Sequence, residues 1–122
     1  MAALPPIVLS QWQYSTDKAV WRTLSTLADW PQQTLSTADK VYLRHSVYLS
    51  PTDFCVRYLL HLEAAPKNTQ VYVNGWQVGT TGGESFRANV TDQVALDDNL
   101  IELTVCQPGT FGRVYLQAVP CA

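Results

Sequence analysis

The stretch VYVNGWQVGTTGG, residues 71–83, consists of two β-forming arms that meet at an Asn-Gly pair. In the first arm the two valines point to one side and Tyr72 to the other, as in a strand with one buried face. Asn74 and Gly75 readily take the two positive-φ positions that a type I′ turn requires. The Gly-Gly pair that ends the second arm suits a bend or a close approach of other backbone. The stretch therefore predicts a tight β-hairpin.

The alternation of apolar and polar residues continues on both sides of this hairpin. In VYLRHSVYL, residues 41–49, the valines and leucines share one face with His45, while Tyr42, Arg44, Ser46 and Tyr48 share the other. Similar runs are FCVRYLLHLE (54–63), SFRANV (85–90), LIELTVC (100–106) and RVYLQAV (113–119). Short strands with turn signals at intervals of about ten residues predict an all-β fold, an antiparallel sandwich or barrel, in one domain over residues 1–122.

The segment 18–40 carries a mixed signal. Val20, Leu24 and Leu27 lie at helical spacing, behind a possible cap at residues 16–17. The aromatic residues before and within the segment, together with its threonines, favour strand instead. We expect strand and loop here.

Composition limits the classes of partner. Hydrophobic residues make up 47% of the chain and charged residues 15%, with 8 basic against 10 acidic side chains. Without a cationic surface, neither nucleic acid nor an anionic membrane is an expected partner. No run approaches the length of a membrane span, and the proline-interrupted start does not resemble a signal peptide. We expect a soluble, cytoplasmic protein.

The three cysteines, at 55, 106 and 121, form no CxxC motif and are odd in number. Two of them lie in strand-like runs. This pattern favours buried free thiols in a reducing compartment over a disulfide framework.

Four segments resemble the N-terminal sugar-binding domain of glycoside hydrolase family 2, the β-galactosidase and β-glucuronidase group. They are SQWQYSTD (10–17), VYLRHSVYLSP (41–51), the run 69–105 that begins TQVYVNG and ends IELTV, and TFGRVYLQAVP (110–120). The resemblance implies a galactose-binding-like jelly-roll sandwich, present here as a stand-alone copy. Segment 18–40 matches loosely, and TTGGESFRANV lacks the aromatic pair often found after the glycines.

In that family the domain is followed by an immunoglobulin-like domain and by a catalytic barrel that holds the paired glutamates. The resemblance covers neither, so it implies a non-catalytic role. It also implies that this domain supports the barrel and the oligomer in the parent enzymes.

The acidic residues give no clear catalytic pair. Glycoside hydrolysis needs two carboxyl groups facing each other across a sugar-sized cleft, whereas most acids here lie in predicted turns. Asp97, Asp98 and Asn99 could join a carbonyl in a calcium site, but the turn interpretation is simpler. No metal and no cofactor is expected.

Histidine and cysteine offer a second alternative. His45 and His61 could meet across paired strands near Cys55 or Cys106, which would suit nucleophilic catalysis or metal binding. We interpret both histidines as structural or surface residues.

Aromatic side chains are the better candidates for ligand binding. Sugar rings stack on exposed aromatic rings, and amides and charged groups hold the hydroxyls. The candidates are Trp76, Trp30 and Tyr72, with Asn74, Gln77, Glu84 and Arg87 as polar partners. Three further rings, Trp12, Trp21 and Phe86, are assigned to the core. For Trp76 the alternative is packing across the hairpin.

Three functions follow, in order of preference. The first is a non-catalytic carbohydrate-binding module. The second is a scaffold or interaction domain without sugar affinity, as a homodimer or as an accessory subunit of a glycosidase. The third is a small enzyme.

Overall fold

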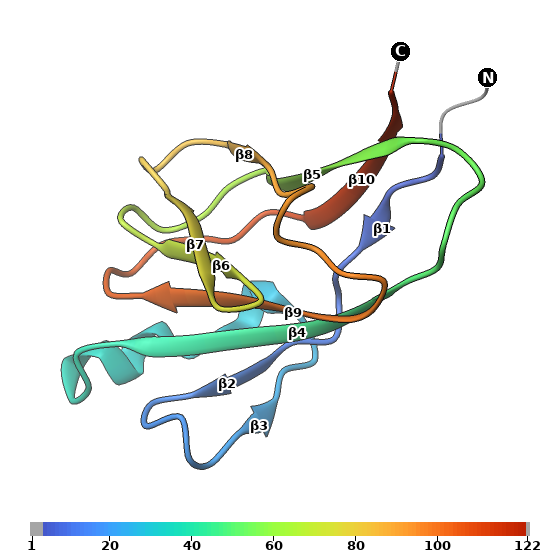
Figure 1. Cartoon of the computed structure of the whole chain (residues 1–122). Helices are drawn as coiled ribbons and strands as arrows, with labels where there is room; N and C mark the ends of the chain where they lie inside the picture. Colours follow the sequence, from blue (N-terminus) through green and yellow to red (C-terminus); the bar gives the residue numbers. More distant parts are fainter. Residues whose placement is uncertain (1–3, 122) are drawn as a thin grey trace.

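The structure, a computed structural model, describes residues 4–121 (Figure 1). These residues form ten strands and two short 3₁₀ helices. The strands are β1 (Ile7–Val8), β2 (Gln13–Ser15), β3 (Arg22–Thr23), β4 (Val41–Leu49), β5 (Val56–Leu62), β6 (Gln70–Val73), β7 (Trp76–Thr80), β8 (Phe86–Asn89), β9 (Asp97–Val105) and β10 (Val114–Pro120), and the helices are η1 (Leu27–Asp29) and η2 (Gln32–Ser36).

Within the described residues the strands build two sheets. One has the order β1-β10-β5-β8 and the other β3-β2-β4-β9-β6-β7, and every pairing is antiparallel. From β4 onward the chain passes repeatedly from one sheet to the other, which is typical of a jelly roll (Figure 1). The prediction of an all-β antiparallel sandwich is confirmed.

The core lies between the two sheets and follows the predicted alternation. In β4 the four aliphatic residues Val41, Leu43, Val47 and Leu49 are buried, and in β9 Ile101, Leu103 and Val105 are fully buried. Alternate residues of β5 and β10 meet them from the smaller sheet. Trp12 is fully buried, as predicted, and Phe86 packs against the core. Trp21 differs from its prediction: it is only half-buried, because β3 lies at the edge of the larger sheet.

The hairpin at residues 71–83 forms as predicted. Strands β6 and β7 pair with Val73 opposite Trp76, so Asn74 and Gly75 are the whole loop. Their φ angles are +51° and +84°, both positive, as a type I′ turn requires. The hairpin completes the far edge of the larger sheet beside β9.

Segment 18–40 contains loop, the short strand β3 and both 3₁₀ helices. The expected strand and loop are present, whereas the 3₁₀ turns were not expected. The hydroxyl of Thr26 accepts a hydrogen bond from the Ala28 amide and caps η1, which places Leu27 and Trp30 in the core. Within residues 4–121 no helix is long and apolar enough to cross a membrane.

The prediction of free, buried thiols is wrong. Cys55 and Cys121 form a disulfide with their Cα atoms 5.3 Å apart, and Cys106 is free but exposed. Cys55 lies just before β5 and Cys121 just after β10, and these two strands are paired neighbours. The sequence pattern placed two of the three cysteines in strand-like runs, but it could not show which strand ends meet.

Candidate functional site

The predicted ligand-binding residues do not form one site. Trp30 is 3% exposed, its indole N–H donates to the Gly109 carbonyl oxygen at 2.9 Å, and its ring meets Phe111 edge-on. It therefore has no free face on which a sugar could stack. Trp30 is a core residue, because the loop before β10 covers it.

Trp76 has the opposite surroundings. It is 69% exposed at the start of β7, the outermost strand of the larger sheet. Gln77 beside it is also exposed, and its amide donates to the Thr80 hydroxyl. Both side chains are open to solvent, but as consecutive strand residues they project to opposite faces of the sheet.

The side chain of Asn74 is used in hydrogen bonds within the protein. Its side-chain oxygen accepts from the Leu100 amide at 2.8 Å, and its NH₂ group donates to the Gln93 carbonyl and to Asn99 Oδ1. These bonds tie the hairpin turn to β9. The carboxamide has few remaining donors or acceptors for a ligand.

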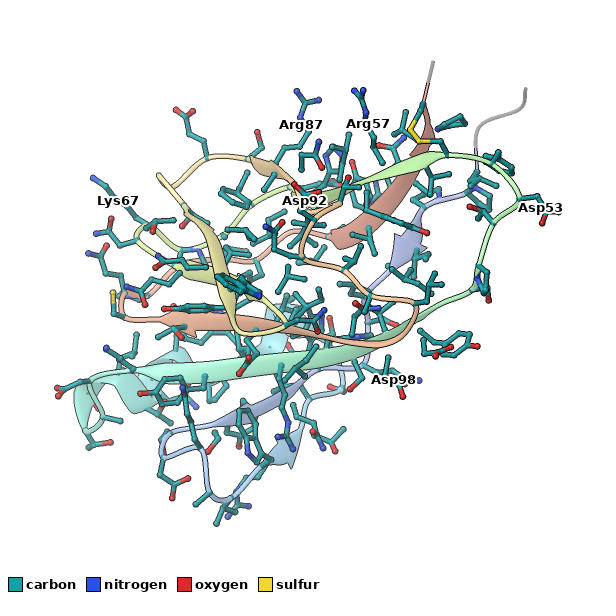
Figure 2. The ribbon with its side chains drawn as sticks, viewed as in Figure 1. Asp53, Arg57, Lys67, Arg87, Asp92 and Asp98 are labelled. Atoms are coloured by element: carbon teal, nitrogen blue, oxygen red, sulfur yellow. A yellow bond between two sulfur atoms is a disulfide. The ribbon has the colours of Figure 1, made fainter. Side chains whose placement is uncertain are left out.

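Glu84 and Arg87 lie away from the tryptophan. Arg87 is on β8 in the smaller sheet, where Figure 2 shows it projecting outward, and Glu84 lies in the exposed bend before that strand. Because Tyr72 and Trp76 belong to the larger sheet, the sequence-predicted residues are divided between two sheets.

The calcium alternative finds no support at residues 97–99. Asp97 begins β9 with a φ of +75°, and Asp98 is exposed (Figure 2). Asn99 is buried, and its side-chain oxygen accepts from Asn74 and from the Ala95 amide. In the described part of the chain no group of three or more His, Cys, Asp or Glu residues could hold a metal ion.

The histidines belong to separate sheets. His45 meets the buried Trp12 ring at 5.2 Å between centroids, and His61 stacks on Tyr115 at 4.6 Å. Burial lowers the pKa of His45, and a weaker backbone interaction with Ser46 opposes that effect. None of these contacts joins a histidine to a cysteine.

The outer face of the larger sheet carries a hollow of about 300 Å³, which we call the Tyr groove. It is lined by Lys18, Lys40, Tyr42, Gln70, Tyr72, Gly75, Glu102 and Thr104. Tyr42 comes from β4, Thr104 and Glu102 from β9, and Tyr72 from β6. Three adjacent strands thus present outward-facing side chains to one concave surface.

The strand register places these side chains in two neighbouring rows. Tyr42 lies opposite Thr104, which lies opposite Gln70, and Glu102 lies opposite Tyr72. The strands that carry the two tyrosines are separated by β9, so they lie about 10 Å apart. The Tyr72 hydroxyl donates to Gln70 Oε1 at 2.9 Å, and the Lys18 ammonium lies 4.7 Å from the centre of the Tyr42 ring.

Sequence reasoning identified only Tyr72 among these residues. The alternation already placed Tyr42 on the polar face of its strand, but it could not show that β4 and β6 lie on either side of β9. This strand order brings together residues 42, 72 and 102, which are far apart in the sequence.

A scan against protein-family models and a search of curated proteins each returned no match. Solved structures of similar fold do exist. The β-glucuronidase of Dictyoglomus thermophilum matches with a TM-score of 0.80 at 18% identity, over 95% of this chain and 28% of its own. The FMN-binding β-glucuronidase of Faecalibacterium prausnitzii L2-6 matches at 0.74 and 22% identity, over 95% of this chain and 22% of its own.

A glycosyl hydrolase family 2 member from Bacteroides cellulosilyticus matches at 0.72 and 17% identity, over 94% of this chain and 21% of its own. The chain thus spans only about a fifth to just over a quarter of the length of these structures. The resemblance to family 2 is confirmed at the level of fold: the chain has the fold of one segment of the family 2 glycoside hydrolases and β-glucuronidases.

Proposed function

We propose that this protein is a non-catalytic carbohydrate-binding module that holds its ligand in the Tyr groove. The observation that carries the proposal is the placement of Tyr42 and Tyr72 on either side of Glu102 and Thr104 in one concave surface. Phenol rings offer apolar faces to sugar C–H groups, and the carboxylate, hydroxyl and amide between them can bond sugar hydroxyls. The structures of similar fold named above are glycosidases.

The acid content of the groove favours binding over hydrolysis. Among its lining residues, all in the described part of the chain, Glu102 is the one acid. Both inverting and retaining glycosidases generally need a second carboxyl group across the scissile bond. The two lysines of the rim can bond hydroxyls or an acidic substituent, but they supply no such acid.

Binding measurements on tyrosine variants test the proposal. A glycan array with the wild-type protein selects a ligand, and calorimetric titration then measures its affinity for the variants. We expect Tyr42→Ala and Tyr72→Ala each to weaken binding about fivefold, the effect of losing one stacking contact of about 1 kcal/mol.

The matched control is Tyr48→Ala. Tyr48 is on the same strand as Tyr42 and is 59% exposed, but it lies outside the groove. Its removal should leave the affinity unchanged. Equal effects of all three substitutions, or no glycan binding by the wild type, would contradict the proposal.

A second function, docking onto another chain, is favoured by a separate observation. The structures of similar fold contain this segment within much longer chains. The exposed Trp76 on the edge strand β7 is a natural contact for such a partner, or for a second copy. Association that depends on concentration, is lost in Trp76→Ala and occurs without any glycan response would support this second function.

A further inference from the structure

A second hollow, of about 450 Å³, opens between the chain before β2 and the middle of β4; we call it the Arg44 cavity. Strand β4 pairs with β9 along all nine of its residues, but with β2 only from Tyr42 to Arg44. Beyond Arg44 the chain before β2 turns inward, because Trp12 enters the core and its indole donates to the Leu9 carbonyl. The cavity occupies the gap that this divergence leaves.

Arg44 lies at the mouth of this gap and is held from two sides. Its Nε donates to Gln13 Oε1 at 2.9 Å, and its guanidinium carbon lies 3.8 Å from the centre of the Trp21 ring. The Trp21 indole in turn donates to the Lys18 carbonyl. These contacts fix the plane of the guanidinium and leave the two terminal NH₂ groups for another acceptor.

Arg44 forms no ion pair with a residue in the described part of the chain. No acidic residue is among the cavity's lining residues, all of which lie in the described part of the chain. Glu102 lies opposite Arg44 in the sheet, yet it lines the Tyr groove and forms no ion pair with Arg44.

The other residues that line the Arg44 cavity supply polar groups that can bond a sugar. Ser10, Ser25 and Ser46 contribute hydroxyls to the cavity. His45 also lines the cavity, but its Nδ1 is buried from solvent and is not exposed to a ligand there.

We propose that the Arg44 cavity binds a carboxylate-bearing ligand of monosaccharide size, a hexuronic acid. The carboxylate accepts two parallel hydrogen bonds from the terminal NH₂ groups of Arg44, a geometry that the planar guanidinium fits. The ring hydroxyls bond the hydroxyls of the three serines. The Arg44 cavity shares no lining residue with the Tyr groove, so this site stands apart from the proposed function.

The experiment is a titration of the isotopically labelled full chain, followed by amide NMR, with sodium glucuronate, glucose and sodium acetate at equal ionic strength. We expect glucuronate to shift the amides of Arg44, His45 and Ser46, with about tenfold weaker binding of glucose and of acetate. Glucose lacks the carboxylate, and acetate lacks the hydroxyls.

Variants then assign the contact. Arg44→Gln should weaken glucuronate binding about tenfold, and Arg44→Lys should weaken it by a smaller factor, since it keeps the charge but loses the planar fork. The control Arg57→Gln removes an exposed arginine from the smaller sheet (Figure 2) and should leave binding unchanged. Because the wild-type shifts locate the ligand without any variant, the test survives even if Arg44→Gln does not fold.

Several results would overturn this inference. The first two are an affinity for glucose, or for acetate, equal to that for glucuronate. The others are amide shifts confined to the surroundings of other arginines, and unchanged glucuronate binding in Arg44→Gln. Tyr72→Ala should not affect glucuronate binding. A failure of the Tyr groove and a failure of the Arg44 cavity are therefore distinguishable.

Discussion

At the scale of single residues, His45 follows the sequence pattern of its strand, yet its burial disfavours the protonated form of the imidazole. It occupies the apolar face of β4, where the alternation predicts a buried side chain, and it contacts Trp12. Removal of water from the imidazole lowers its pKa below the ordinary value of about 6.5. The neutral form is therefore the form that the fold accommodates.

The pH dependence of stability follows from that shift. Below a pH of about 6.5 the unfolded chain protonates this histidine first, so the unfolded state is favoured as the pH falls toward the lower folded pKa. We expect the wild type to lose more unfolding free energy than His45→Gln between pH 7.5 and 5.5, measured by urea denaturation. The difference between the two proteins isolates this residue, and identical losses would contradict the prediction.

At the scale of elements, the β6–β7 hairpin is the unit that local sequence specifies most completely. Gly75 takes a φ of +84°, in the region that residues with a Cβ atom rarely adopt. Asn74 beside it holds the turn to β9 through two side-chain hydrogen bonds, and to Gln93 in the loop before β9 through a third. The turn is stabilised both by its own conformational preference and by its contacts with the sheet.

Substitutions at two glycines distinguish the effect of backbone conformation on stability from the effect of side-chain packing. Gly75→Ala should lower the unfolding free energy by about 1 kcal/mol, because alanine is strained at positive φ although no atom lies within 4 Å of the added Cβ. The control is Gly82→Ala, where the space is equally open but φ is not in the positive region. That variant should be neutral or slightly more stable in thermal and urea unfolding. An equal loss in both would show that the turn conformation is not the cause.

At the scale of the whole molecule, the disulfide links the ends of two neighbouring strands in the smaller sheet. It joins the start of β5 to the end of β10, which are paired neighbours but lie 66 residues apart in the sequence. The same two cysteines also share a backbone hydrogen bond, in which the Cys121 amide donates to the Cys55 carbonyl oxygen at 3.0 Å. Disulfides persist mainly in oxidising compartments, so this pairing removes the cysteine-based argument for a reducing one.

Loss of this cross-link should destabilise the fold. The double variant Cys55→Ser/Cys121→Ser should lose about 2–4 kcal/mol of unfolding free energy, since a long loop in the unfolded chain is no longer closed. Cys106→Ser changes an exposed, free thiol and serves as the control, with an expected effect within about 0.5 kcal/mol. Urea denaturation without reductant measures all three proteins. If the double variant matched the wild type, the cross-link would not contribute to stability.

The candidate sites show where prediction from sequence reached its limit. Trp30 and Trp76 were both candidates for ligand stacking, yet one is buried against Phe111, far along the chain, and the other is exposed on an edge strand. The polar face of β4 was predicted correctly, including Tyr42 and Arg44. Their neighbours Thr104 and Trp21 were not, because they come from distant parts of the sequence.

The sequence by itself determined the class of fold, the inward and outward faces of most strands, and the type I′ turn. These features depend on neighbours a few residues away: side chains of a strand alternate between faces, and the turn needs residues that tolerate positive φ. The tertiary structure decided which strands lie side by side, and with that the Tyr groove, the Arg44 cavity and the disulfide. Strand order depends on how two whole sheets bury their apolar faces together, and no short stretch of sequence contains that information.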